Sequence, residues 1–127
     1  MFIKILFILN YIIFITSYIY TVLINPGIPK REHYIKNYKN KKIDITQWKK
    51  CLKCNILIPK NFKTVHCNDC KVCVREQDHH CPWTGKCIGK YNLVQFYFFL
   101  FFLLIFIFST FLTFLLFIVY LQEENKI

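Results

Sequence analysis

Ten residues that can bind metal or act as a nucleophile or a base gather in the middle of the chain. They are the seven cysteines and three of the histidines: Cys51, Cys54, His66, Cys67, Cys70, Cys73, His79, His80, Cys81 and Cys87. The C-x2-C spacing occurs at Cys51–Cys54 and is repeated in the run Cys67–Cys73. In this spacing a short turn directs two thiolates toward one tetrahedral zinc ion. Its repetition beside histidines predicts zinc sites.

The number of ligands leaves one cysteine over. Two closed sites of four ligands each need eight in all. The six cysteines other than Cys81, together with His66 and His80, supply that number and leave Cys81 and His79 unused. Counting alone does not choose the spare cysteine, but Cys81 belongs to no C-x2-C pair and is flanked by His80 and Pro82-Trp83.

The cysteines are better suited to metal than to disulfides. Their odd count, and a cytosolic position argued below, make disulfide bonds a poor use for them. A segment this short and polar cannot bury enough apolar surface to fold alone, whereas structural zinc contributes on the order of 10 kcal/mol. We therefore expect a loop-rich, metal-held domain with short β-hairpins.

Two long apolar stretches flank this segment. Residues 5–24 carry no charge, and at about 1.5 Å per residue they span roughly 30 Å, the thickness of a bilayer core. Residues 91–122 are also uncharged and rich in phenylalanine; their length predicts tilt or a helical extension beyond the membrane. The alternatives are a buried soluble helix for either stretch and a cleaved signal peptide for the first, which no small-residue cleavage site follows.

These patterns predict an α-helical membrane protein in which two transmembrane helices flank a small, loop-rich, double-zinc domain with short hairpins. The predicted parts are a transmembrane helix at 1–24, a basic linker at 25–50, the cysteine-rich zinc domain at 51–91, a transmembrane helix at 92–121 and a tail at 122–127. The chain combines 55% hydrophobic residues with a net charge of +10. That combination excludes an ordinary soluble globule.

The charge distribution predicts the orientation. Fifteen of the seventeen lysines and arginines lie between Lys30 and Lys90, which by the positive-inside rule places the middle segment in the cytosol and both termini across the membrane. The linker is then either solvated or attracted to anionic lipid heads. Tethering to the membrane at both ends argues against nucleic acid as a partner, which leaves a zinc module for nucleic acid as the weakest alternative.

The run Asp78-His79-His80-Cys81-Pro82-Trp83 closely resembles that of the DHHC protein S-acyltransferases. The cysteine and histidine array precedes the run, and Cys87-Ile88-Gly89 and Asn92 follow it. Asn25-Pro26-Gly27 is similar to the family's Asp-Pro-Gly motif after a span. The resemblance covers about residues 25–102.

The resemblance implies two interleaved structural zinc sites and a catalytic Cys81. The implied ligands are Cys51, Cys54, His66 and Cys73 for one zinc, and Cys67, Cys70, His80 and Cys87 for the other. It implies a palmitoyltransferase that moves a long acyl chain from palmitoyl-CoA to Cys81 and then to a substrate cysteine. A thiolate with a nearby base suits this chemistry, with His79 as the base and Asp78 orienting its ring.

Cys81 lies shortly before the second apolar stretch, so we expect it at the membrane interface, where an acyl chain remains in lipid. Lys86 is expected to favour the thiolate, and Lys86 and Lys90 either attract coenzyme A phosphates or form the positive flank of a span. The expected partners are acyl-CoA, the bilayer and proteins with cysteines near the membrane. The expected location is an endomembrane, such as the endoplasmic reticulum or Golgi, or the plasma membrane.

The chain departs from the family in its number of spans. The family has four, and only the second and third have counterparts here. A truncated gene model, or a catalytically inactive zinc-binding membrane adaptor of the same fold, therefore stands as the alternative to an active transferase.

Overall fold

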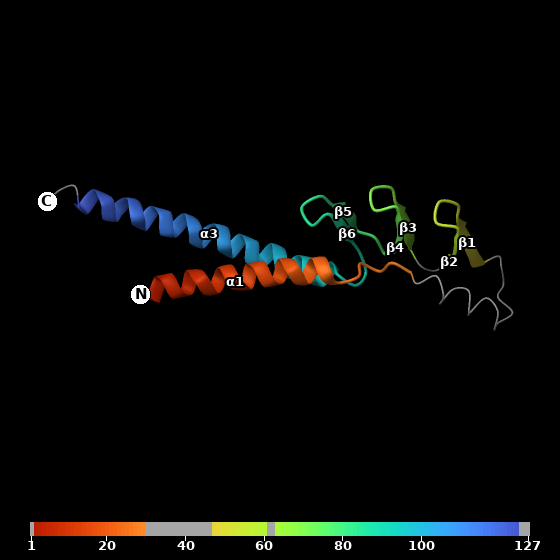
Figure 1. Cartoon of the computed structure of the whole chain (residues 1–127), viewed down its shortest axis with the longest axis horizontal. Coiled ribbons are helices and arrows are strands. Elements are labelled where there is room, and N and C mark those ends of the chain that lie inside the picture. The colour runs from red at the N-terminus through yellow and green to blue at the C-terminus, as the bar shows by residue number, and fades with distance from the viewer. Residues whose placement is uncertain (1, 30–46, 61–62, 125–127) are drawn as a thin grey trace. The chain divides into compact units, whose positions relative to one another are not determined.

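The computed structural model describes residues 2–29, 47–60 and 63–124, which fold into two compact units. The helical unit consists of the chain up to Tyr20 and from Gln95 onward, and the hairpin unit spans Thr21–Val94. Two long helices, α1 (Phe2–Leu23) and α3 (Leu93–Glu124), come before and after three β-hairpins in the sequence (Figure 1). The fold class predicted from the sequence is thereby confirmed.

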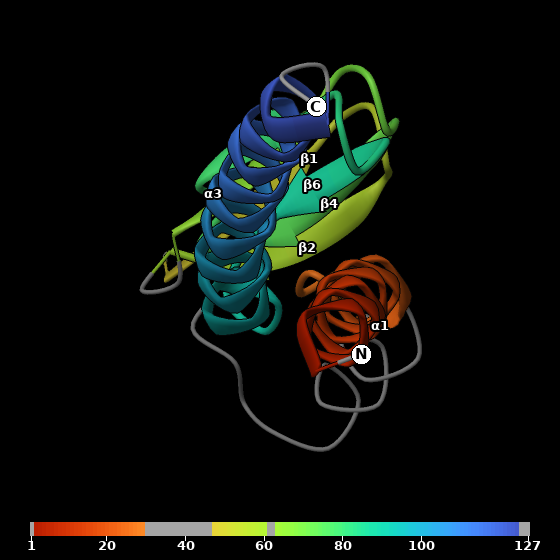
Figure 2. The same ribbon diagram turned by 90° about the vertical axis from the view of Figure 1, so that its left-hand side faces the viewer.

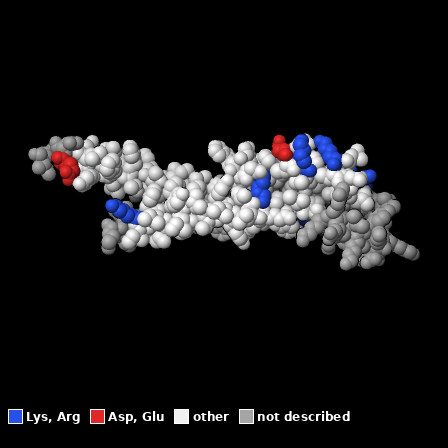
Figure 3. Space-filling view, viewed as in Figure 1, with Lys and Arg blue, Asp and Glu red and all other residues white. Residues whose placement is uncertain are grey.

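Both helices have the length and composition to cross a membrane. The candidate span in α1 is Lys4–Leu23, with mean hydropathy 1.9, and that in α3 is Leu93–Glu124, with mean hydropathy 2.8. Very little of either span is buried inside the protein, which favours helices that face lipid over the buried core helix of a soluble protein. Figure 3 shows an uncharged surface over both helices except near their ends, with Lys and Arg gathered over the hairpins. The protein is a membrane protein, and α3 continues beyond residue 121.

Aromatic rings and one polar pair join the helices. The Phe14 ring stacks on Phe106, with centroids 5.2 Å apart, and on Phe99 at 5.9 Å. The Asn10 side-chain amide donates a hydrogen bond of 2.9 Å to the Ser109 hydroxyl. Viewed nearly end-on, α1 and α3 are two separate coils side by side (Figure 2). A hydrogen bond between spans satisfies polar groups that lipid would leave without partners.

Three antiparallel hairpins follow one another in the hairpin unit. Strand β1 (Trp48–Cys51) pairs with β2 (Ile56–Pro59), and β3 (Thr64–Cys67) pairs with β4 (Val72–Arg75). Strand β5 (His79–Cys81) pairs with β6 (Lys86–Ile88). Each pair is a separate two-stranded sheet, and an isolated two-stranded hairpin is at best marginally stable in water.

Cysteines make up much of the small core of this unit. The most deeply buried hydrophobic residues in it are Ile58, Cys67, Cys73, Val74, Cys81, Cys87 and Ile88. Few large aliphatic side chains are among them. Burial of apolar surface therefore stabilises this unit weakly, and metal ligation by the cysteines is the natural source of the remaining stability.

The turn after α1 packs on the hairpins. The Asn25 side-chain oxygen accepts hydrogen bonds from the backbone amides of Gly27 (2.9 Å) and Ile28 (2.7 Å), and the Gly27 carbonyl accepts one from the Arg75 amide (3.0 Å). Gly27 has φ of 114°, which favours glycine. A Cβ atom on Gly89 would lie 2.5 Å from the Pro26 carbonyl oxygen. The chain therefore needs a glycine at residue 89 for this close approach.

The predicted basic linker is described only at its two ends. Residues 30–46, which include His33 and most of the linker's basic side chains, lie outside the described residues. At the far end, β1 begins at Trp48, so the first strand starts inside the segment predicted as linker.

Candidate metal centres and active site

The first and second hairpins together form one cluster of metal-binding side chains. Cys51 and Cys54 come from the first hairpin, and His66 and Cys73 come from the second. The sulfur atoms of Cys51, Cys54 and Cys73 lie 3.7, 3.1 and 3.9 Å from His66 Nδ1. His66 and Cys73 are directly opposite each other in the β3–β4 pair, so strand register fixes half of this site.

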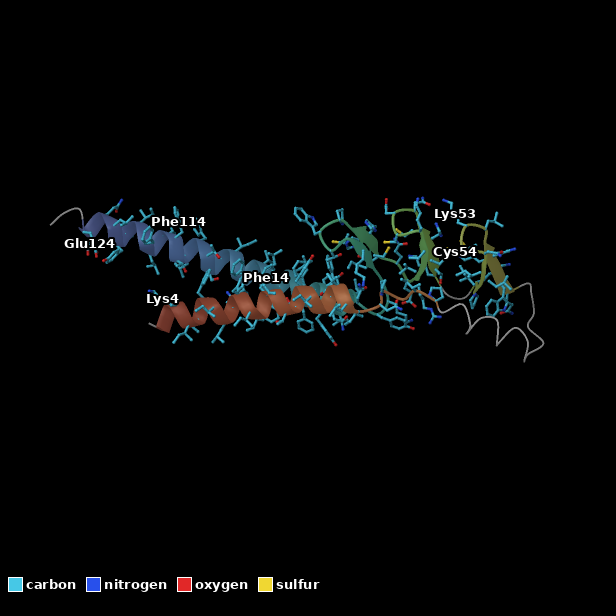
Figure 4. The ribbon with its side chains drawn as sticks, viewed as in Figure 1. Lys4, Phe14, Lys53, Cys54, Phe114 and Glu124 are labelled. Carbon is cyan, nitrogen blue, oxygen red and sulfur yellow. The ribbon has the colours of Figure 1, made fainter. Side chains whose placement is uncertain are left out.

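The second and third hairpins repeat the arrangement. Cys67 and Cys70 come from the second hairpin, and His80 and Cys87 face each other across the third. The sulfur atoms of Cys67, Cys70 and Cys87 lie 3.7, 3.2 and 3.9 Å from His80 Nδ1. These two clusters are the two ligand sets that the resemblance implied. Figure 4 shows the sulfur atoms in the hairpins, with Cys54 labelled beside Lys53.

The donor atoms fit a tetrahedral zinc ion. Bonds of about 2.3 Å to sulfur and 2.0 Å to nitrogen place the two donors about 3.5 Å apart, and the six distances range from 3.1 to 3.9 Å. Burial and neighbouring thiols raise the pKa of Cys73 and of Cys87. Because these buried thiols resist losing their protons, a cation is needed to hold them as thiolates.

Cys81 belongs to neither cluster. It ends strand β5, pairs with Lys86 across the hairpin and is 3% exposed. Successive side chains of a strand point to opposite faces. His79 and Cys81 therefore share one face of β5, while His80, between them, points into the second cluster.

His79 is oriented by its neighbour Asp78. His79 Nδ1 lies 2.9 Å from Asp78 Oδ2, and both side chains are about half-exposed. When Nδ1 donates a hydrogen bond to the carboxylate, Nε2 is the ring nitrogen left to interact with the Cys81 thiol. Burial lowers the pKa of His79, but hydrogen bonds and charges from Asp78 and Cys81 outweigh it and raise the pKa above its ordinary value. This pair thus favours the imidazolium form.

The surroundings of Cys81 favour its thiolate. Burial raises the pKa of Cys81, but hydrogen bonds from the Thr84 hydroxyl and amide, from His79 and from the Trp83 amide bring the pKa below its ordinary value. The pKa of Cys81 is lowered and that of His79 is raised, so each shift favours the charged form of its group. Both shifts favour a thiolate beside an imidazolium, the reactive form of a cysteine nucleophile.

Both nearby lysines have partners in the structure. The Lys86 ammonium donates hydrogen bonds to the Val22 and Ile24 carbonyls at the end of α1, the second of 2.8 Å. Lys90 forms an ion pair with Glu76. The hypothesis that Lys86 favours the thiolate therefore needs correction, because its amine is directed to the helix end.

Asn92 is a supporting residue to which sequence reasoning gave no role. It is fully buried, its side-chain amide donates to the Cys87 carbonyl (3.1 Å), and its side-chain oxygen accepts from the Gly89 amide (2.9 Å). It thereby fixes the loop between the last ligand and α3. The available signal was an asparagine immediately before a helix, a position where capping side chains are common.

Comparisons with known proteins agree with this geometry. A family model described as DHHC palmitoyltransferase matches residues 44–127. The chain is 39% identical over 77 residues to palmitoyltransferase ZDHHC9 of Homo sapiens, covering 59% of this chain and 21% of that protein. It is 35% identical over 82 residues to palmitoyltransferase ZDHHC7 of Mus musculus, covering 61% of this chain and 25% of that protein.

A third relative matches over more of the chain. Palmitoyltransferase akr1 of Schizosaccharomyces pombe is 35% identical over 103 residues, which cover 76% of this chain and 16% of that protein. The chain thus spans a quarter or less of the length of these curated relatives.

Proposed function

The chain belongs to the DHHC palmitoyltransferase family, and on this premise we propose that it moves a long acyl chain from acyl-coenzyme A to protein cysteines through a thioester on Cys81. One observation carries the proposal. Of the seven cysteines, Cys81 alone stays outside both metal clusters, and its thiol interacts with a histidine whose other nitrogen is held by a carboxylate.

In the first step of the proposed reaction, His79 takes the proton of the Cys81 thiol. The thiolate attacks the carbonyl carbon of the acyl-CoA thioester, and the bond between that carbon and the coenzyme's sulfur breaks. Coenzyme A leaves as a thiol after receiving the proton from His79. Asp78, 2.9 Å from the ring, stabilises the imidazolium between these two proton transfers.

In the second step, His79 takes the proton of a substrate cysteine. The resulting thiolate attacks the acyl carbon on Cys81, the bond from that carbon to the Cys81 sulfur breaks, and the Cys81 thiolate is restored. Both steps exchange one thioester for another. The reaction therefore needs no energy input. The enzyme contributes by positioning a thiolate and by accepting and returning one proton at His79.

Zinc would be held by the two clusters and would supply folding stability to the hairpin unit. Because two ligands of the second cluster, His80 and Cys87, lie on the hairpin that carries Cys81, metal binding would fix the backbone around the nucleophile. Cys81 itself acts without metal contact in this proposal, which leaves a sulfur lone pair free to attack.

The membrane has a part in the proposal as well. A fatty chain gains about 0.8 kcal/mol per CH₂ that leaves water, so a lipid environment beside the nucleophile would retain the donor. An apolar groove of about 610 Å³ runs between α1 and α3 and is lined mainly by aliphatic and aromatic side chains. We propose this groove as a surface for acyl chains, with the hairpin unit in the cytosol by the positive-inside rule, in a multi-pass protein of an endomembrane or the plasma membrane.

The test is formation of the acyl-enzyme. The chain, reconstituted in lipid with zinc, is incubated with radiolabelled palmitoyl-CoA, and protein-bound label that hydroxylamine releases is measured. The native chain is expected to carry such label, Cys81→Ser to carry none, and His79→Gln to acquire it much more slowly. Absence of label on the native chain with two zinc ions bound would contradict the proposal and favour a zinc-binding adaptor.

A further inference from the structure

The hairpin that carries Cys81 is built like the two hairpins that carry the metal-binding C-x2-C pairs. Cys51, Cys67 and Cys81 each end the first strand of a hairpin. Each pairs across the hairpin with the residue five positions later. These partners are Ile56, Val72 and Lys86. Three turns of equal length, starting from a cysteine at the same place, therefore recur along the chain.

The backbone of the three turns also agrees in detail. The residue four positions after the first cysteine has a left-handed conformation in every case: φ is 53° at Asn55, 57° at Lys71 and 63° at Gly85. Positive φ is uncommon for residues other than glycine. Its recurrence at the same place in each turn indicates one turn geometry used three times.

A backbone amide occupies the same place in each of the three turns. In the second turn the amide of Cys70, the third residue after the cysteine, donates a hydrogen bond of 3.4 Å to the Cys67 sulfur. The first and third turns have the same length, strand register and left-handed residue, so the amides of Cys54 and Thr84 occupy the corresponding place beside Cys51 and Cys81. Amide donors at this place hold the sulfur of the first cysteine in the turn.

The third turn differs in its second ligand position. Thr84 occupies the place of Cys54 and Cys70 and is almost completely buried. Its hydroxyl donates a hydrogen bond of 3.3 Å to the Cys81 carbonyl oxygen. The first two turns each receive a histidine and a cysteine from the next hairpin, whereas no histidine or cysteine follows Cys87 in this sequence.

We propose that Cys81 occupies a third metal knuckle that has no metal, and that Thr84 is a positioning residue in it. The shape of the turn, and the hydrogen bond from the Thr84 hydroxyl to the Cys81 carbonyl, hold the sulfur where a metal would otherwise hold it, and the lone pair that would bind the metal is directed at the acyl carbon. The inference rests on the proposed role of Cys81 as nucleophile, but the knuckle geometry is testable without acyl transfer.

The test restores the missing ligand. Thr84→Cys completes a C-x2-C pair with Cys81, next to His79, while Trp83→Cys adds a cysteine to the same turn one position out of register. The Trp83 side chain is 86% exposed, so the control leaves the core unchanged. Both reduced, lipid-reconstituted chains are titrated with zinc acetate, and bound zinc is counted by native mass spectrometry. Alkylation of Cys81 by N-ethylmaleimide is mapped in parallel.

Thr84→Cys is expected to bind a third zinc that protects Cys81 from alkylation, while Trp83→Cys and the native chain retain two. Two zinc ions in Thr84→Cys with Cys81 fully alkylated would overturn the inference, as would a third zinc in Trp83→Cys. Because these measurements use no acyl donor, their failure is distinguishable from failure of the proposed acyl transfer.

A second pair of variants keeps the inference testable if Thr84→Cys folds poorly. Thr84→Val has nearly the same shape without the hydroxyl, and Thr84→Ser retains it. Since the loss of a buried hydrogen bond carries about a tenfold effect, backbone hydrogen exchange in the peptide that contains residues 81–88 is expected to become about tenfold faster in Thr84→Val and to return to the native rate in Thr84→Ser. Equal rates in the native chain and both variants would overturn the positioning role.

Discussion

Replacing Lys86 by methionine removes a cation from the end of a membrane helix. The native ammonium donates to the carbonyl of Val22, in the last turn of α1, and to that of Ile24, just after the helix. Carbonyls at the end of a helix have no intrahelical partner. Methionine has similar length but donates no hydrogen bond. Because Lys86 is also opposite Cys81 in the β5–β6 pair, the substitution is expected to loosen the connection between the end of α1 and the nucleophile hairpin.

The magnitude follows from three contributions. A hydrogen bond to a charged group contributes about 1.5–3 kcal/mol when buried, and a cation at a helix C-terminus adds about 0.3–1 kcal/mol. Burial lowers the pKa of Lys86, which shows that desolvating the ammonium offsets part of this gain, and the side chain retains some exposure. We therefore expect Lys86→Met to cost about 1–2 kcal/mol in local stability.

The assay is hydrogen exchange measured by mass spectrometry on the lipid-reconstituted, zinc-loaded chain. A loss of 1–2 kcal/mol corresponds to about fivefold to thirtyfold faster exchange in the peptides that contain residues 22–28 and 81–88. Lys90→Met is the matched control, since Lys90 forms a surface ion pair with Glu76 and such pairs contribute about 0–1 kcal/mol.

The reasoning fails if Lys86→Met and Lys90→Met change exchange in these peptides to the same extent. It also fails if the effect of Lys86→Met is confined to β6 and leaves the end of α1 unchanged. Either result would mean that the lysine does not join the two segments.

Three further predictions concern the site and its supports. The alkylation rate of Cys81, plotted against pH, should have its midpoint below that of free cysteine, because the pKa of Cys81 is lowered. Asp78→Asn removes the carboxylate that stabilises the His79 imidazolium and should move this midpoint upward. An unchanged midpoint would contradict the interaction of His79 with Cys81. Gly89→Ala should destabilise the hairpin unit by about 3 kcal/mol, because the added Cβ would clash with backbone. Gly85→Ala should cost about 1–2 kcal/mol, because residue 85 has open space around it but a positive φ. Both are measured from the denaturant concentration at which half of the zinc is released, and equal shifts for the two variants would refute the clash. Asn92→Asp should lower the free energy of unfolding obtained from that midpoint by about 3 kcal/mol, more than Asn92→Ala does, because a buried carboxylate would face the carbonyl to which the amide donates. A smaller effect for aspartate than for alanine would contradict this account.

The sequence predicted the elements whose physics is local. An uncharged stretch of residues 5–24 followed by Asn25-Pro26-Gly27 is sufficient to predict a helix and its end, and the structure has α1 at Phe2–Leu23. The shortness and polarity of the segment, together with its metal ligands, predicted a loop-rich unit with short hairpins, and the structure has three. The division of the ligands between two clusters came from family resemblance and not from spacing.

What the sequence could not predict depends on contacts between distant residues. Lys86 is far from Val22 in the sequence, and no local pattern indicates that its amine reaches the helix end. The roles of Gly89 and Asn92 likewise depend on how loops approach one another, at Pro26 and at Cys87. The similarity of the third turn to the metal knuckles was hidden because Thr84 replaces the cysteine by which such turns are recognised.

X-ray absorption at the zinc edge, combined with a zinc count, tests most directly whether Cys81 is the thiol that the metal sites leave free. The account predicts about two zinc ions per chain, each with three sulfur neighbours and one nitrogen neighbour, and the same count and spectrum for Cys81→Ser. Loss of zinc or of a sulfur neighbour in Cys81→Ser would show that Cys81 is a ligand and would contradict the account.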